Sequence, residues 1–473
     1  MPSTNMSVLI QGGQIVSSSG ATPADVLITG ETITAVIEPG SDMSESAARS
    51  SARIVDATGC YVVPGGVDVH THLQLPMSPE ATSSDSFASG TVAAAWGGTT
   101  TVIDFAGQML GSEVRQVVED RQAEAQGQCA IDYSFHLSMG DINERSLKEM
   151  KGIVDDGITS FKFFMAYPGA YYSDDGQLLQ AMQQAGELGA LSMMHAENGI
   201  AIDVLRDQAV KRGDIEPVWH GRTRPARLEG EAVHRASALA EVAEAPLYIV
   251  HLTSVEALEQ VAWARDNGQN VFAETCPQYL YLSFEEHLNQ PGMEGLRHVC
   301  SPPLRPASTH DHLWKGLRVN DLAVVSTDHC PFCDAEKKLG IDDFRPTPNG
   351  LGSLEHRMDL IFQGVVAGEL SLARWVDTCS TTPARLFGLY PRKGVLAPGS
   401  DADVVIYDPA VEHTLGVATH HMNIDNSVWE GMAVRGQVRT VFSRGSVVLD
   451  NRNFNGRAGH GQFLARSLSD VLL

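Results

Sequence analysis

The chain has 473 residues, of which 43% are hydrophobic and 7% aromatic, which is enough for a sizeable core. Lys and Arg number 34 against 58 Asp and Glu, so the net charge is −24 at pH 7. A field of this sign repels phosphate backbones and anionic membrane surfaces, so we expect a small neutral or cationic partner, no nucleic acid and no membrane. Seven cysteines are few and odd in number, which argues against a secreted disulfide scaffold.

The N-terminus, MPSTNMSVLI, has no basic region ahead of an apolar stretch, so it is not typical of a signal peptide. No run approaches the roughly 18 apolar residues that a membrane helix needs. From these two patterns we expect a soluble cytoplasmic protein.

Short apolar runs separated by turn residues occur at both ends of the chain. They cover 7–16, 24–30 and 32–37 near the N-terminus, and 394–408 and 438–450 near the C-terminus. Their spacing predicts strands, and the two ends of a chain often lie close together. We therefore expect 1–62 and 391–473 to form one small β-sandwich. The Ser- and Ala-rich stretch 41–52 predicts a surface loop.

The middle of the chain alternates strand-like runs with longer amphipathic segments such as 176–189 and 254–268. This alternation predicts βα units and a parallel sheet. Eight such units close a (β/α)₈ barrel, so the sequence predicts an α/β fold with a TIM-like barrel over 63–390. The eight runs are 61–72, 99–106, 131–139, 158–166, 191–198, 247–254, 270–279 and 322–330.

Metal-binding or charged residues close five of these runs. In a barrel, the C-terminal ends of the strands carry the active site, so these side chains are aimed at one central point. A single histidine would usually be a core or loop residue, but chance placement on so many strand ends is improbable. The six residues are His70, His72, Lys162, His195, His251 and Asp328.

The first of these runs ends in the pattern His-Thr-His. His70 and His72 share a strand face with Asp68, because side chains alternate with period two. Two imidazoles on one face can bind one metal ion, and Asp68 is placed to orient a histidine. His329 follows Asp328 directly and is expected to point away from the site.

Lys162 lies among aromatic residues in the run SFKFFMA. Burial drives a lysine toward its neutral form, and a neutral amine can react with carbon dioxide to give a carbamate that bridges two cations. The alternative is a lysine that extends from the strand end into solvent. Four histidines, an aspartate and a carbamate fit two zinc ions better than one. The pair Cys330 and Cys333 has no second C-x-x-C partner, so we expect no structural metal or redox role for it.

Along nearly its whole length the chain resembles the cyclic amidohydrolases, and within them the dihydropyrimidinase and hydantoinase group. The H-x-H and GSDAD motifs are shared widely, whereas FMAY, ETCPQYL, SPPLR and PNG are specific to this branch. The resemblance implies that His70, His72 and Asp328 hold one zinc and that His195 and His251 hold the other. It also implies that a carbamate on Lys162, together with a hydroxide, bridges the two zinc ions.

The same resemblance implies the remaining roles. Asp328 and Tyr167 are the expected catalytic residues, Tyr167 through its hydroxyl on the reacting oxygen. Tyr167, Ser301 and Asn349 are expected to bind the cyclic diamide. Members of this group are commonly homotetramers, in which the tail, here about 446–473, reaches a neighbour.

The expected reaction is hydrolytic ring opening of 5,6-dihydropyrimidines, as in pyrimidine degradation, or of 5-substituted hydantoins, giving N-carbamoyl amino acids. Alternatives are an allantoinase, another cyclic amidase, or a non-enzymatic relative that keeps the fold as a scaffold. Every ligand position is filled, which argues against the scaffold. Gln74 stands where dihydroorotases carry Arg and allantoinases usually Asn, and we expect it on the same strand face as His72.

Overall fold

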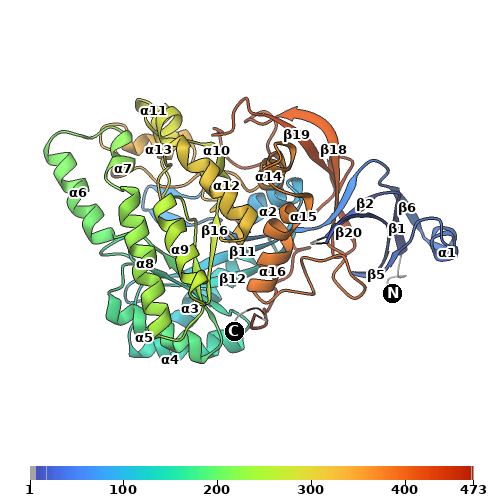
Figure 1. Ribbon diagram of the computed structural model, residues 1–473, viewed down its shortest axis with the longest axis horizontal. Helices are drawn as coiled ribbons and strands as arrows, with labels where there is room; N and C mark the ends of the chain where they lie inside the picture. The colour runs from blue at the N-terminus through green and yellow to red at the C-terminus, as the bar shows by residue number, and fades with distance from the viewer. Residues whose placement is uncertain (1–6, 18, 470, 472–473) are drawn as a thin grey trace.

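A parallel eight-stranded sheet forms the centre of the computed structural model, which describes residues 7–17, 19–469 and 471 (Figure 1). Its strands lie in chain order and correspond to the eight predicted runs. The first predicted run, 61–72, is split between two sheets, with 61–64 in one and 66–71 in the other. Gly65 joins the two parts where a Cβ would collide with the Thr100 side chain. The barrel strands are β8 (Gly66–Thr71), β11 (Thr99–Gln108), β12 (Asp132–Met139), β13 (Ser160–Phe164), β14 (Leu191–His195), β15 (Leu247–Ile249), β16 (Val271–Thr275) and β17 (Val324–Val325).

Hydrogen bonds between the first and last strand ends close the ring. The His72 N–H donates to the His329 carbonyl at 2.8 Å, and the His329 N–H donates to the His70 carbonyl at 3.3 Å. Buried apolar side chains, among them Val67 and Ile103, fill the interior. The predicted α/β barrel is therefore confirmed, and its closure brings the ends of β8 and β17 together.

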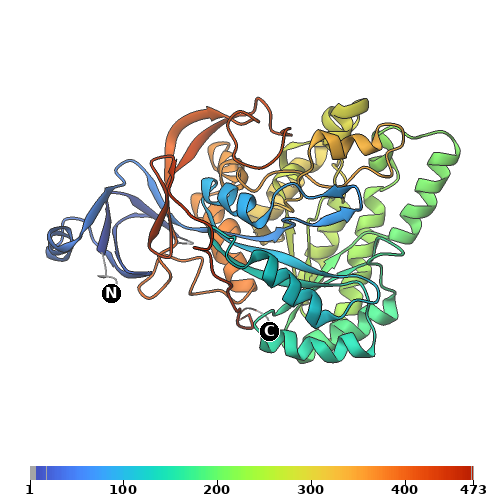
Figure 2. The same ribbon diagram turned by 180° about the vertical axis from the view of Figure 1, so that it is seen from behind.

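Helices surround the barrel, as the two opposite views show (Figures 1 and 2). α4 is typical: Asn143 caps its first turn, and Met150 and Ile153 lie on its buried face. The longer helices are α2 (Phe87–Trp96), α3 (Val114–Ala125), α4 (Glu144–Asp155), α5 (Asp175–Glu187), α6 (Gly199–Lys211), α8 (Ala226–Val242), α9 (Val255–Asp266), α12 (His310–Val319) and α14 (Arg357–Val366). Shorter ones are α7 (Val218–Arg222), α10 (Pro277–Tyr281), α11 (Gly292–Arg297), α13 (Asp334–Lys337), α15 (Leu372–Val376) and α16 (Thr382–Leu386).

Strands from the two ends of the chain pair beside the barrel, where blue and red ribbons lie together in Figures 1 and 2. A core that includes Val26, Val62 and Ile406 packs together from both sheets, as expected for a sandwich. One sheet orders β21 (Asn453–Phe454), β20 (Ser446–Asp450), β19 (Ala433–Ser443), β18 (Val404–Thr414), β7 (Tyr61–Pro64), β2 (Gln14–Ser17) and β3 (Gly20–Pro23). The other orders β5 (Thr32–Ile37), β4 (Asp25–Thr29), β1 (Ser7–Gln11) and β6 (Arg53–Asp56).

The loop predicted over 41–52 is wrong, because the structure forms helix α1 (Asp42–Ser50) there. Ser41 caps the helix by accepting from the Ser44 N–H, and Asp42 adds a negative charge to the first turn. Ala47 packs in a small cluster with Leu9 and Ile37. Composition alone suggested a loop, whereas the cap and the buried alanine stabilise a helix.

The C-terminal segment runs beneath the barrel of its own chain. The Leu464 N–H donates to the Tyr133 carbonyl at 2.7 Å, and Arg466, 4% exposed, donates to the Phe135 carbonyl at 2.6 Å. Residues 460–467 therefore belong to the base of the barrel in space. The domain boundaries at 62/63 and 390/391 stay a prediction.

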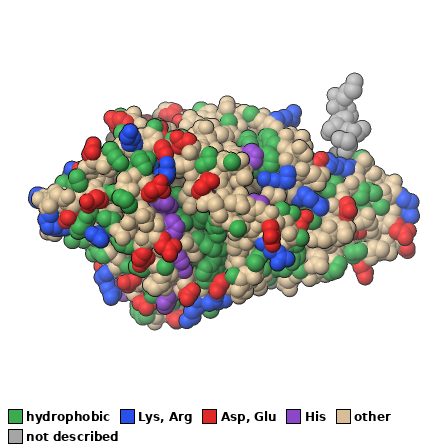
Figure 3. Space-filling view, turned by 90° about the horizontal axis from the view of Figure 1, so that it is seen from above, with side chains coloured by type: hydrophobic (Ala, Val, Ile, Leu, Met, Phe, Trp, Pro, Cys, Tyr) green, Lys and Arg blue, Asp and Glu red, His purple; other side chains and the backbone are tan. Residues whose placement is uncertain are grey.

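The surface was expected to disfavour anionic partners. On the face drawn in Figure 3, acidic and basic side chains are interspersed. Among the described residues, no helix combines the length and the apolar character that crossing a bilayer requires.

Candidate active site

One cavity of about 300 Å³ opens at the C-terminal ends of the barrel strands. His70 lies beneath it, fully buried, in contact with Lys162 and Asp328. The structure thus brings together all nine residues that the sequence singled out. The other eight line the cavity: His72, Lys162, Tyr167, His195, His251, Ser301, Asp328 and Asn349.

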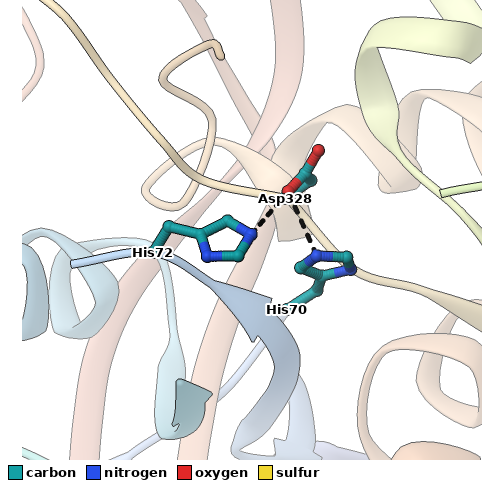
Figure 4. A group of neighbouring side chains, drawn as sticks. All are labelled: His70, His72 and Asp328. Carbon is teal, nitrogen blue, oxygen red and sulfur yellow. Dashed lines mark ion pairs between the residues drawn. The ribbon is translucent and has the colours of Figure 1, made fainter. Parts of the chain in front are cut away.

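His70, His72 and Asp328 form the first group of possible metal ligands (Figure 4). Asp328 Oδ1 lies 3.2 Å from His70 Nε2 and 3.2 Å from His72 Nε2. Burial opposes ionisation of Asp328, but the neighbouring His70 and His72 outweigh it and lower its pKa to about 2. An ionised carboxylate therefore faces two imidazole nitrogens, a donor set that suits zinc.

Glu274, at the end of β16, orients the His70 ring. His70 Nδ1 lies 2.5 Å from Glu274 Oε1, which also accepts from the His251 N–H at 3.1 Å. Burial lowers the pKa of His70 far below its ordinary value, so the ring is neutral. With its proton on Nδ1 toward the carboxylate, Nε2 keeps its lone pair toward the cavity.

His195 and His251 form the second group. His195 Nδ1 lies 2.8 Å from His251 Nε2, and His195 Nε2 lies 2.9 Å from Glu197 Oε2. Burial alone would raise the pKa of Glu197, but its hydrogen bond to His195 lowers it, so an ionised carboxylate orients this ring. The two facing nitrogens therefore lie where one cation can bind both.

Lys162 lies between the two groups and is buried. Its Nζ is 2.9 Å from His70 Nε2 and lies over the Phe105 ring, 4.3 Å from the centroid. Burial lowers the pKa of Lys162 to about 8, with Asp328 acting in the opposite direction. The alternative of a lysine that extends into solvent is wrong, because aromatic side chains enclose it.

Tyr167 enters the cavity from the loop after β13. Its φ of 63° is left-handed, and its carbonyl accepts from the N–H groups of Ala170 and Tyr171. His251 and Asp328 also have positive φ, at 39° and 51°. Such backbone is uncommon outside glycine and gathers at functional sites, where the surrounding structure imposes it.

Ser301 and Asn349 also line this cavity. The Ser301 hydroxyl lies 3.4 Å from His220 Nε2, and the Ser301 side chain also hydrogen-bonds Tyr167. The mouth is apolar and includes Leu75, Met77, Met109 and Tyr171. A polar inner wall and an apolar mouth suit a ring with an apolar substituent.

Two sequence expectations about neighbouring residues are wrong. Asp68 Oδ1 accepts from the backbone N–H groups of His70 and Thr327, so Asp68 holds backbone and not an imidazole ring. Gln74 is exposed, has a φ of 56° and is absent from the cavity wall. Strand β8 ends at Thr71, so the period-two alternation no longer applies at position 74. His329 points away as expected and bonds Asp85.

The sequence patterns do not identify Glu274 and Glu197 as partners of the histidines. Each has a local signal, since Glu274 is the penultimate residue of strand β16 and Glu197 lies two residues after His195. Their contacts could not be read from spacing alone, because Glu274 reaches His70 across 204 residues of chain.

The residues present fit a metal centre by their chemistry. Four imidazoles, an ionised carboxylate and an amine converge, with the carboxyl groups of Glu197 and Glu274 behind them. His72 Nδ1 and His251 Nδ1 are buried without a hydrogen-bond partner among the described residues, while their Nε2 atoms face the cavity groups.

The sequence profile described as "Amidohydrolase family" matches residues 61–448, a span that holds every residue of this site. The chain belongs to this family. This amidohydrolase is 51% identical to a D-hydantoinase of Streptomyces coelicolor, over 98% of the chain and 99% of that protein. It is 44% identical to a D-hydantoinase of Geobacillus stearothermophilus, over 99% and 98%. The crystal structure of a dihydropyrimidinase from Brevibacillus agri superposes with a TM-score of 0.95 at 44% identity, over 98% of this chain and 99% of that one.

Proposed function

We propose that this amidohydrolase opens the rings of cyclic diamides by hydrolysing a ring amide bond. The products are N-carbamoyl amino acids. The observation that carries the proposal is the convergence of two histidine groups, Asp328 and Lys162 in one barrel cavity, in a chain 51% identical to a D-hydantoinase over its length.

The metal centre in this proposal holds two zinc ions. His70, His72 and Asp328 would hold one and His195 and His251 the other, because these donors are grouped in this way. When bound, the two cations supply a nucleophile from water near neutral pH and polarise the amide carbonyl. Mn²⁺ or Co²⁺ would suit the same ligands.

Lys162 would carry the bridging anion. Its neutral amine would attack the carbon of CO₂, and the nitrogen would release one proton to solvent water, which gives a carbamate with two oxygens. The lowered pKa of about 8 supports this step, because it leaves a fraction of the amine neutral near pH 7.

Asp328 and Tyr167 would perform the proton transfer and the charge stabilisation. Asp328, ionised before the reaction, takes a proton from the attacking water and passes it to the leaving ring nitrogen. Burial raises the pKa of Tyr167 above its ordinary value, so its hydroxyl keeps its proton and donates it in a hydrogen bond to the oxyanion. Ser301 and Asn349 bind the amide edge of the ring.

The preferred substrate in this proposal is a 5-substituted hydantoin of the D configuration, with dihydropyrimidines also accepted. The names of the two D-hydantoinases and of the dihydropyrimidinase support these choices. The apolar mouth favours an apolar substituent. The described cavity lining contains no arginine, so an anionic ring such as dihydroorotate lacks a partner for its carboxylate.

The homotetramer and the cytoplasmic location remain proposals that rest on the resemblance and on composition. So does the division into 1–62, 63–390 and 391–473.

A substrate panel tests the proposal. Values of kcat/KM are measured for D- and L-5-phenylhydantoin, dihydrouracil, dihydrothymine, allantoin and dihydroorotate. The proposal expects D-5-phenylhydantoin to be the best substrate and dihydroorotate the poorest. Best turnover of allantoin or dihydroorotate would contradict it.

A further inference from the structure

Lys337, the last residue of α13, is a buried lysine that has no part in the reaction described above. It is 1% exposed, and none of the described carboxylates forms an ion pair with it. A buried ammonium without a counter-charge is costly unless every N–H is hydrogen-bonded. Its surroundings therefore have to supply three acceptors.

Three backbone carbonyls supply them. Lys337 Nζ donates to the carbonyls of Val299 at 2.8 Å, Pro348 at 2.9 Å and Gly350 at 2.8 Å. An ammonium has three N–H donors, so all are used. Burial lowers the pKa of Lys337 to about 8, which still leaves most molecules protonated at pH 7.

These carbonyls belong to the two segments that carry Ser301 and Asn349. Val299 precedes Ser301 by two residues, and Pro348 and Gly350 flank Asn349 on either side. The Gly350 N–H also donates to the Val299 carbonyl at 3.0 Å, so the segments are directly paired beside the lysine. Ser301 and Asn349 line the same cavity.

The turn around Asn349 has little room to adjust. Gly350 has a φ of 153°, and a Cβ there would lie 2.2 Å from the Cys330 carbonyl oxygen. The turn is thus packed against the segment that follows Asp328. A shift of the Lys337 side chain would therefore also shift the turn that carries Asn349 in the cavity wall.

We propose that Lys337 is a positioning residue for substrate binding. Its ammonium connects the segment 299–301 to the turn 348–350 and fixes the spacing between Ser301 and Asn349. This inference rests on the proposed function, in which those two residues bind the ring edge. Lys337 touches neither the ring nor the metal ligands, so it acts on affinity for the ring.

Lys337→Met removes all three donors and keeps an apolar chain of similar length. Lys338→Met is the matched control, because Lys338 is exposed and adjacent. For D-5-phenylhydantoin we expect KM to rise about tenfold or more in Lys337→Met, with kcat within about threefold of wild type and unchanged metal content. A lower kcat with unchanged KM would overturn the proposal. That result is expected when the substitution only unfolds part of the sample, because unfolding lowers the concentration of active enzyme and leaves KM unchanged.

Hydrogen–deuterium exchange of the metal-loaded protein tests the connection without any substrate. Exchange in 296–305 and 345–353, including the Gly350 N–H, should be faster in Lys337→Met than in wild type and Lys338→Met. Unchanged exchange there would overturn the proposal. If the wild-type protein hydrolyses no cyclic diamide, the proposed function is refuted. The exchange measurement still decides whether Lys337 connects the two segments. If Lys337→Met is unfolded, both measurements are made on Lys337→Gln, which keeps one NH₂ donor. We again expect a higher KM and faster exchange than in wild type.

Discussion

Lys162 Nζ lies 2.9 Å from His70 Nε2, the same nitrogen that faces Asp328 at 3.2 Å. An ammonium at this point would compete with any cation for His70. A carbamate on the same nitrogen would reverse the charge and supply oxygens to two cations. Binding of two cations therefore depends on the chemical state of Lys162.

Lys162→Ala should bind neither metal firmly and should lose activity, while the barrel stays folded, because the ligands are a local feature of the strand ends. Acetate or propionate added to this variant should restore part of the activity by supplying an external carboxylate. Metal analysis, circular dichroism and activity with and without the acid check this. Lys151→Ala, at an exposed lysine paired with Asp155, is the control. Full zinc content and activity in Lys162→Ala would return Lys162 to a structural role.

Reactivation of metal-free protein should depend on pH through Lys162. Its pKa is lowered to about 8, and only the neutral amine reacts with CO₂. At a fixed concentration of dissolved CO₂ and zinc, the reactivation rate should rise with pH up to about 8 and then level off. Rates measured between pH 6 and pH 9.5 check this. A rate that falls across this range would contradict the carbamate step.

Tyr167→Phe should keep fold and metal but lower kcat by about 10²–10³, the usual loss for one oxyanion donor. The KM should change little, because the hydroxyl acts on charge that develops in the transition state. Steady-state kinetics check this, with Tyr172→Phe, on the same loop but outside the cavity wall, as control. A raised KM with unchanged kcat would assign Tyr167 to substrate binding only.

Burial raises the pKa of Glu274 to about 7, so its carboxyl is only partly ionised near neutral pH. Glu274→Gln should weaken metal binding by about 10–100-fold, because an amide is a weaker acceptor than a carboxyl group for the His70 Nδ1 proton. The KM of the metal-loaded variant should stay close to wild type. Competition with a zinc chelator measures the affinity. Wild-type affinity in Glu274→Gln would show that the Glu274 contact does not tune His70.

Much of the site followed from the sequence because the barrel makes distant strand ends converge. His195 and His251 are 56 residues apart in the chain, yet both close parallel strands and therefore meet. The resemblance to a known group added Ser301 and Asn349, which spacing alone does not indicate. The sequence does not indicate which ring nitrogen of His70 or His195 faces the cavity, because the orientation of each ring depends on its contact with Glu274 or Glu197.

The errors arose where a local rule was extended past its element. Gln74 was assigned to the His72 face by strand alternation, but β8 ends at Thr71 and the backbone turns left-handed at Gln74. Asp68 does share the strand face, yet its Oδ1 accepts from two backbone N–H groups and its Oδ2 from the Thr327 hydroxyl. In both cases the backbone conformation or backbone pairing decided the outcome, and side-chain patterns do not encode either.

A metal titration measures directly whether ring opening takes place at a two-metal site. Metal-free protein is titrated with Zn²⁺ in bicarbonate buffer while hydrolysis of D-5-phenylhydantoin is followed. We expect activity to reach its maximum at about two equivalents of zinc per chain, as a two-metal centre requires. Maximal activity at one equivalent, or no hydrolysis at any zinc level, would contradict a two-metal mechanism.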